Sequence, residues 1–166
     1  MKKKLSFIGI LIIFLIIIIQ FIKPSPNASP VIIANNISSK YFIPEEVQAI
    51  LKNSCYDCHS NTTDYPWYSR VQPLAWYLDN HIVDGKKHLN FDEFVNYPLH
   101  TQYKKFNKIK ELVHDGEMPL YSYTLLHWKA ALDSAQKTTI IDWATNGINQ
   151  LEALYPFDSL HLKKSF

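Results

Sequence analysis

The stretch Cys55-Tyr56-Asp57-Cys58-His59 carries the most specific pattern in this chain. Its two cysteines are three residues apart, so in a helix their thiols lie about one turn apart. The pattern uses both cysteines of the chain, and the histidine follows directly. Two thiols at this spacing can add to the two vinyl groups of one haem, and the histidine then lies under the iron. The stretch therefore predicts one covalent haem c held by Cys55, Cys58 and His59.

Two other readings of the motif remain open. A C-x-x-C pair can be a redox dithiol, although a thioredoxin-type motif lies in a βαβ pattern that this sequence does not show. The pair can also be half of a zinc site, which usually needs four ligands. No second C-x-x-C and no closely spaced histidine pair is present. Cys55, Cys58 and His59 with one further histidine would still form a zinc ligand set.

Met118 is the leading candidate for the second axial ligand of the iron. It lies in Gly116-Glu117-Met118-Pro119, after a predicted helix, and the only other methionine is Met1. A thioether ligand raises the reduction potential relative to a second imidazole. The alternatives are a methionine that fills a gap in the core and an imidazole ligand. The rival histidines are His81, His88, His100, His114, His127 and His161.

A proximal histidine normally donates its Nδ1–H to a carbonyl or a carboxylate. The regions of Pro66 and Pro73, just beyond the motif, are candidates to supply that carbonyl. Trp67, Tyr68 and Arg70 are candidates to contact the haem propionates, with core packing or solvent exposure as the alternative for each.

The composition and periodicity favour a single all-α domain. The chain has 166 residues, 47% of them apolar and 14% aromatic, and only four glycines. Few glycines argue against a turn-rich β protein, and no stretch shows strand alternation. Helices are predicted from Pro44 to Cys55, over 71–83 ending at Asp84-Gly85, over 101–114 ending at Asp115-Gly116, and from the N-cap Asp133 to an end or kink at Gly147. A short turn is predicted after Asn90.

The N-terminus predicts a membrane anchor. Three lysines precede an apolar run over 5–22, which is about the minimum length of a transmembrane helix. The positive-inside rule places the lysines in the cytoplasm. The prediction is a signal anchor over 1–22, a Pro/Ser/Asn linker over 23–40 and a haem-binding domain over 41–166. The chain would then be a single-pass protein of the bacterial inner membrane with a periplasmic domain; a cleaved signal peptide is the alternative.

The motif, the Met-Pro loop and the closing helix resemble class I c-type cytochromes. The chain is more closely similar to the small bacterial haem-binding domain family. This resemblance covers roughly residues 42–150 and implies an all-α, cytochrome c-like fold with Cys55, Cys58, His59 and Met118 at the haem. The residues of this chain that carry the resemblance are Cys55–Asn61, Tyr65–Ser69, Pro73, Trp76, His81, Gly85, Leu89–Phe91, Gly116–Pro119 and Trp143-Ala144.

These observations predict a tethered electron carrier that exchanges electrons with membrane redox proteins. A six-coordinate His/Met iron needs no substrate, so the chain is predicted to be a carrier rather than an enzyme. The alternatives are a haem sensor or a gas- or peroxide-binding domain with a displaceable sixth ligand, and an exported protein that binds another metal. A net charge of +2, spread along the chain, does not indicate nucleic-acid binding.

Overall fold

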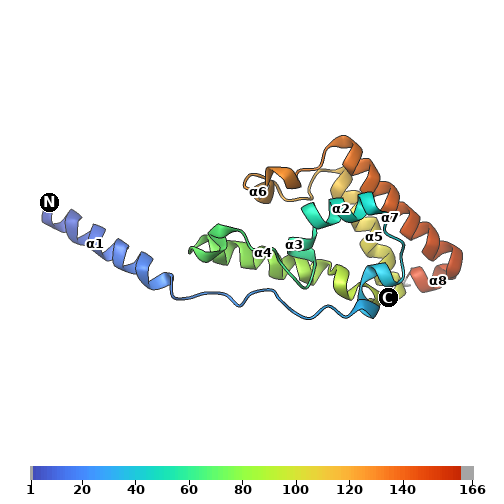
Figure 1. Ribbon diagram of the computed structural model, residues 1–166, viewed down its shortest axis with the longest axis horizontal. Helices are drawn as coiled ribbons and strands as arrows, with labels where there is room; N and C mark the ends of the chain where they lie inside the picture. The colour runs from blue at the N-terminus through green and yellow to red at the C-terminus, as the bar shows by residue number, and fades with distance from the viewer. Residues whose placement is uncertain (1, 162–166) are drawn as a thin grey trace, which may run out of the picture.

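The computed structural model describes residues 2–161, whose regular secondary structure is helical, in agreement with the predicted all-α character (Figure 1). They contain no strand, and a single isolated bridge pairs Ala28 with Thr62. Met1 and residues 162–166, which the sequence assigns to the anchor and to the haem-binding domain, lie outside the described part. The helices are α1 (Lys2–Ile19), η1 (Ile33–Asn35), η2 (Ile37–Ser39), α2 (Glu45–Ser54), α3 (Tyr56–His59), η3 (Trp67–Arg70), α4 (Leu74–His88), η4 (Phe91–Asn96), α5 (Leu99–His114), α6 (Tyr121–Thr124), η5 (Trp128–Ala130), α7 (Ser134–Leu154) and α8 (Phe157–Leu160), where η denotes a 3₁₀ helix.

The predicted membrane anchor is wrong. No helix within residues 2–161 is both long enough and apolar enough to cross a membrane. The apolar run extends to Ile22, but α1 ends at Ile19, and its first three residues are lysines. At about 1.5 Å per residue, the part after Lys4 reaches only about 22 Å, against a hydrocarbon core of about 30 Å.

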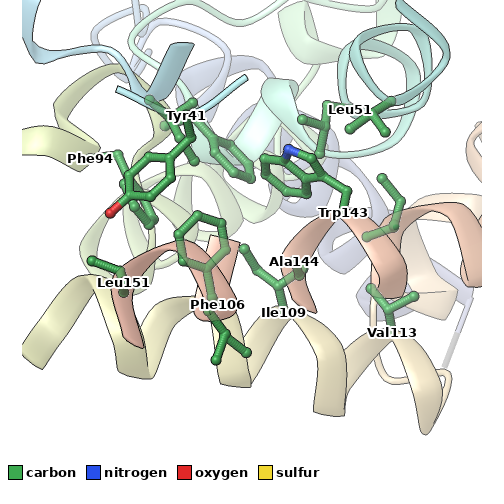
Figure 2. Packing of buried hydrophobic residues seen from close by; sticks show 14 of the residues in the cluster. Tyr41, Leu51, Phe94, Phe106, Ile109, Val113, Trp143, Ala144 and Leu151 are labelled. Atoms are coloured by element: carbon green, nitrogen blue, oxygen red, sulfur yellow. The ribbon is translucent and has the colours of Figure 1, made fainter. Parts of the chain in front are cut away.

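The core lies where α5 crosses α7, with α2 and η4 packed against the pair. Figure 2 shows Phe106 of α5 beside Ala144 and Leu151 of α7, with Trp143 and Tyr41 above it. Phe106 and Ala144 are fully buried. The members of the core cluster are Ile37, Tyr41, Val47, Ile50, Leu51, Phe91, Phe94, Phe106, Ile109, Val113, Ile140, Trp143, Ala144, Ile148, Leu151 and Leu160.

Gly147 lies inside this crossing, and the predicted helix end or kink at that position is wrong. Helix α7 continues to Leu154, and Gly147 is buried. A Cβ at position 147 would lie 2.6 Å from the nearest atom of the Phe106 ring. The glycine therefore provides room for the aromatic ring rather than a break in the helix.

The predicted ends of two helices are confirmed. Helix α7 begins with a capping box, in which the Asp133 side chain accepts from the Gln136 N–H and the Gln136 side chain accepts from the Asp133 N–H. Helix α5 ends at His114, and Gly116, two residues beyond, has a left-handed φ of 73°. The following N–H, of Glu117, donates to the carbonyl of Leu112, as in a Schellman motif. This turn directs the chain into the loop that carries Met118.

The segment predicted as a linker makes ordered contacts with the haem-motif region. The Asn27 amide donates to the Ser60 carbonyl at 3.0 Å and to the Thr63 hydroxyl at 2.9 Å. The Asn27 side-chain oxygen also accepts from Lys86 Nζ at 2.7 Å. Residues near 27 therefore lie along the loop that follows the C-x-x-C-H motif. The division of the chain at residue 40 stays a prediction.

Candidate functional site

The C-x-x-C-H stretch forms one tight helical turn. The carbonyl of Cys55 accepts from the N–H groups of Cys58 at 3.2 Å and of His59 at 3.0 Å. Both cysteines are free thiols. The structure therefore places all three predicted residues on one turn between the end of α2 and the end of α3.

The two thiols lie in apolar surroundings. Cys55 packs against the main core, and Cys58 packs against a second cluster formed by Tyr68, Leu78 and Ile82. Burial raises the pKa of Cys55 to about 12 and that of Cys58 to about 11. Redox-active dithiols have a lowered thiol pKa, so these surroundings do not suit a redox dithiol.

His59 is held by two backbone carbonyls of α4. Its Nδ1 lies 3.0 Å from the oxygen of Gly85 and 2.9 Å from the oxygen of Leu89. Carbonyls only accept, so Nδ1 carries the proton and Nε2 has a free lone pair. Nε2 has no hydrogen-bond partner within residues 2–161. Burial lowers the pKa of His59, which favours the neutral imidazole that binds metals.

These carbonyls are not where the sequence places them. Proximity along the chain favours Pro66 or Pro73, whereas the acceptors come from the last turn of α4, 26 and 30 residues beyond His59. The Gly85 carbonyl also accepts from the N–H of Leu89, the residue that follows α4, at 2.8 Å, and its second lone pair is available to the imidazole.

Gly85 brings α4 close enough for these bonds. A Cβ at position 85 would lie 2.6 Å from the Cys58 carbonyl oxygen and 3.0 Å from the Cys58 Cβ. The prediction that Asp84-Gly85 ends the helix is wrong, since α4 continues to His88. The role of Gly85 is a close approach between α4 and the motif.

A buried polar network supports the turn from the other side. The backbone N–H of Asn61 donates to Asp92 Oδ2 at 2.7 Å, and the Asn90 amide donates to the Asn61 side-chain oxygen at 2.8 Å. Asn90 also caps η4, as predicted, by accepting from the Asp92 N–H at 3.0 Å. The sequence analysis did not identify this network. The Leu89-Asn90-Phe91 run was its only signal. In this run, the Leu89 carbonyl accepts from His59, Asn90 belongs to the network, and Phe91 packs in the core.

Met118 is half-buried in the loop between α5 and α6. This loop returns to the C-x-x-C-H turn, because the Tyr123 hydroxyl donates to Asp57 Oδ2 at 2.6 Å. His127 Nε2 lies 2.6 Å from the Tyr68 hydroxyl. No contact given by the structure tests whether Met118 is a ligand, so that assignment stays a prediction.

In a comparison with known protein families, the family model described as haem-binding domain matches residues 14–146, which is more than half of the chain. The chain belongs to the haem-binding domain family. The matched span includes Cys55, Cys58, His59 and Met118. It begins within α1 and ends within α7. No curated protein and no solved structure matches the chain.

The apolar surface beside the turn fits a haem of this family. Large apolar side chains of η3 and α4 and of the loop after Met118 are exposed, and the Tyr68–His127 contact brings these two segments together. Apolar rings and aliphatic chains suit a flat macrocycle. The exposed residues are Trp67, Val71, Leu74 and Tyr77 on one side and Leu125, Leu126 and Trp128 on the other. With the free thiols and the open Nε2 of His59, the residues present fit a haem.

A cavity of about 1070 Å³ also borders the turn. Its wall includes Tyr56 and Asp57, which separate the two cysteines, and Tyr65, Tyr123 and Trp128. Cys55, Cys58, His59 and Met118 do not line it.

The rival metal readings find little support in the described chain. Within residues 2–161, no group of three or more His, Cys, Asp or Glu side chains is placed to hold a metal ion. His127 is engaged with Tyr68, and His114 Nδ1 lies 2.8 Å from the carboxylate of Asp115. Of the predicted propionate contacts, Trp67 is exposed, whereas the Tyr68 hydroxyl is already bonded to His127.

Proposed function

We propose that the chain is a monohaem c-type cytochrome that transfers electrons, with haem attached to Cys55 and Cys58 and ligated by His59 and Met118. When bound, the haem supplies a one-electron ferric/ferrous couple. We also propose that the chain is related in fold to class I c-type cytochromes, as its sequence predicts.

The state of His59 carries this proposal. Two carbonyls accept from its Nδ1–H, which fixes the ring and leaves Nε2 for a metal. Because these carbonyls accept from the Nδ1–H, the imidazole also becomes a stronger ligand for iron. Two neutral, half-buried thiols one turn away supply the groups that thioether bonds require.

The Met118→Ala variant tests the ligand assignment. The full chain is produced with a c-type haem maturation system, and absorption spectra are recorded in both oxidation states. The ferric wild type is expected to show the charge-transfer band of an iron–methionine bond, and Met118→Ala is expected to lose it. Identical spectra for the two proteins would overturn Met118 ligation.

A haem sensor with a displaceable sixth ligand is the second candidate. The half-buried position of Met118 in a loop outside the helices favours it. Rapid, stoichiometric binding of carbon monoxide to the ferrous wild type would favour the sensor, whereas slow binding would favour the electron carrier. The predicted periplasmic location and membrane redox partners stay predictions.

A further inference from the structure

We propose that Tyr123 and Tyr68 form a two-point latch that holds the Met118 loop on the C-x-x-C-H turn and so sets how firmly Met118 stays on the haem iron. This inference rests on the proposed His59/Met118 ligation. Both tyrosines are positioning residues, since neither is a ligand in the proposal.

The first point of the latch joins α6 to the motif itself. The Tyr123 hydroxyl donates to Asp57 Oδ2 at 2.6 Å, and Asp57 lies between the two cysteines. A hydrogen bond to a carboxylate is roughly twice as strong as a neutral one. Burial and the neighbouring Asp57 raise the pKa of Tyr123, so its hydroxyl remains a donor at neutral pH.

The second point joins His127, which follows α6, to the cluster around Cys58. The Tyr68 hydroxyl lies 2.6 Å from His127 Nε2, and buried Tyr68 packs in the cluster that contacts Cys58. The Tyr123 ring stacks on the His127 ring, with centroids 4.3 Å apart and planes 10° apart. This stacking connects the two points, which both lie on the C-terminal side of Met118.

The position of Met118 between two held ends makes the latch relevant to the ligand. On one side, the Met118 N–H donates to the Leu112 carbonyl at 3.1 Å, at the Gly116 turn. On the other side, Tyr123 is held by Asp57. Helix α6 has only four residues, too few to be stable alone, so the loop depends on these contacts for its position.

The Tyr123→Phe variant removes the first hydrogen bond and keeps the ring. Tyr121→Phe is the matched control, because Tyr121 lies in the same helix, has 76% of its surface exposed and undergoes the same chemical change. Tyr68→Phe removes the second contact separately. Each is made in the full haem-loaded chain, with haem content and far-ultraviolet circular dichroism as checks on folding.

The readouts are the iron–methionine band, the reduction potential and the rate of carbon monoxide binding. Losing a hydrogen bond to a charged group is expected to raise the open-loop population, and with it the carbon monoxide rate, by about tenfold or more. Tyr123→Phe should also weaken the band and lower the potential. Tyr68→Phe should do so to a smaller extent, and Tyr121→Phe should match the wild type.

Two outcomes overturn different parts of the account. A wild-type band that is unchanged in Tyr123→Phe and Tyr68→Phe, with unchanged potential and carbon monoxide rate, overturns the latch and leaves the ligand assignment standing. A wild type that lacks the band overturns the His59/Met118 assignment and the latch with it.

Discussion

Gly85 of α4 and Cys58 of the haem motif are in backbone contact: a Cβ at Gly85 would lie 2.6 Å from the Cys58 carbonyl oxygen. The close approach of these two residues brings the Gly85 and Leu89 carbonyls within hydrogen-bonding distance of His59 Nδ1. The tuning of the proposed proximal ligand therefore depends on a residue that has no side chain.

Gly85→Ala is expected to push α4 away from the motif, because the new methyl group meets backbone that cannot rotate aside. The cost is expected to be about 1–3 kcal/mol of unfolding free energy, as for other overpacked sites. The yield of haem-loaded protein should fall as well. Gly9→Ala is the control, since nothing lies within 4 Å of a Cβ there. Equal denaturation midpoints for the two variants would contradict the close-approach role.

Gly147→Ala tests the crossing of α5 and α7. The new methyl group would meet the Phe106 ring at 2.6 Å, so the variant is expected to lose about 1–3 kcal/mol in urea denaturation. The double variant Phe106→Leu, Gly147→Ala should lose less unfolding free energy than the sum of the losses of the two single variants, because the smaller side chain makes room for the new methyl group. Strictly additive losses would show that the ring and the glycine do not interact.

Asp92→Asn tests the network behind the turn. Asp92 accepts from the Asn61 N–H and, at 2.7 Å, from the Asn36 amide, and an asparagine has only one accepting oxygen. One buried donor is left without a partner, so a loss of about 1–3 kcal/mol is expected. Asp158→Asn, in the exposed part of α8, should change the unfolding free energy by less than about 0.5 kcal/mol. A similar effect of both changes would show that the network contributes nothing specific.

The raised thiol pKa values predict slow alkylation of the haem-free chain. Desolvation raises the pKa of Cys58 to about 11, well above the ordinary value of a thiol, so little thiolate is present at pH 8. Iodoacetamide should react about a hundredfold faster with the urea-unfolded chain than with the native chain at pH 8, where the thiolate fraction controls the rate. The native rate should rise as the pH approaches 11. Equal native and unfolded rates would show that the native fold does not raise the thiol pKa values.

The local signals in the sequence predicted local structure well. The C-x-x-C-H turn, the capping box at Asp133 and the left-handed stop at Gly116 each depend on residues that are neighbours in the chain. Such features need only propensity and short-range hydrogen bonds, which a sequence displays directly.

Contacts between distant segments could not be predicted in the same way. In a sequence, a glycine that stops a helix looks the same as a glycine that lets another chain segment approach. The role of Gly85 depends on its contact with Cys58, and that of Gly147 on its contact with Phe106, and both contacts join residues far apart in the sequence. The carbonyl partners of His59 and the Tyr123–Asp57 bond likewise depend on tertiary packing. The anchor prediction failed because an apolar run in sequence was longer than the apolar part of the helix that it forms.

Mass spectrometry of the denatured full chain, produced with a c-type haem maturation system, tests the central claim most directly. The account predicts a mass increased by one haem that remains bound after denaturation, and loss of that increase in the Cys55→Ser, Cys58→Ser double variant. A denatured wild-type chain with the unmodified mass would contradict covalent attachment to Cys55 and Cys58.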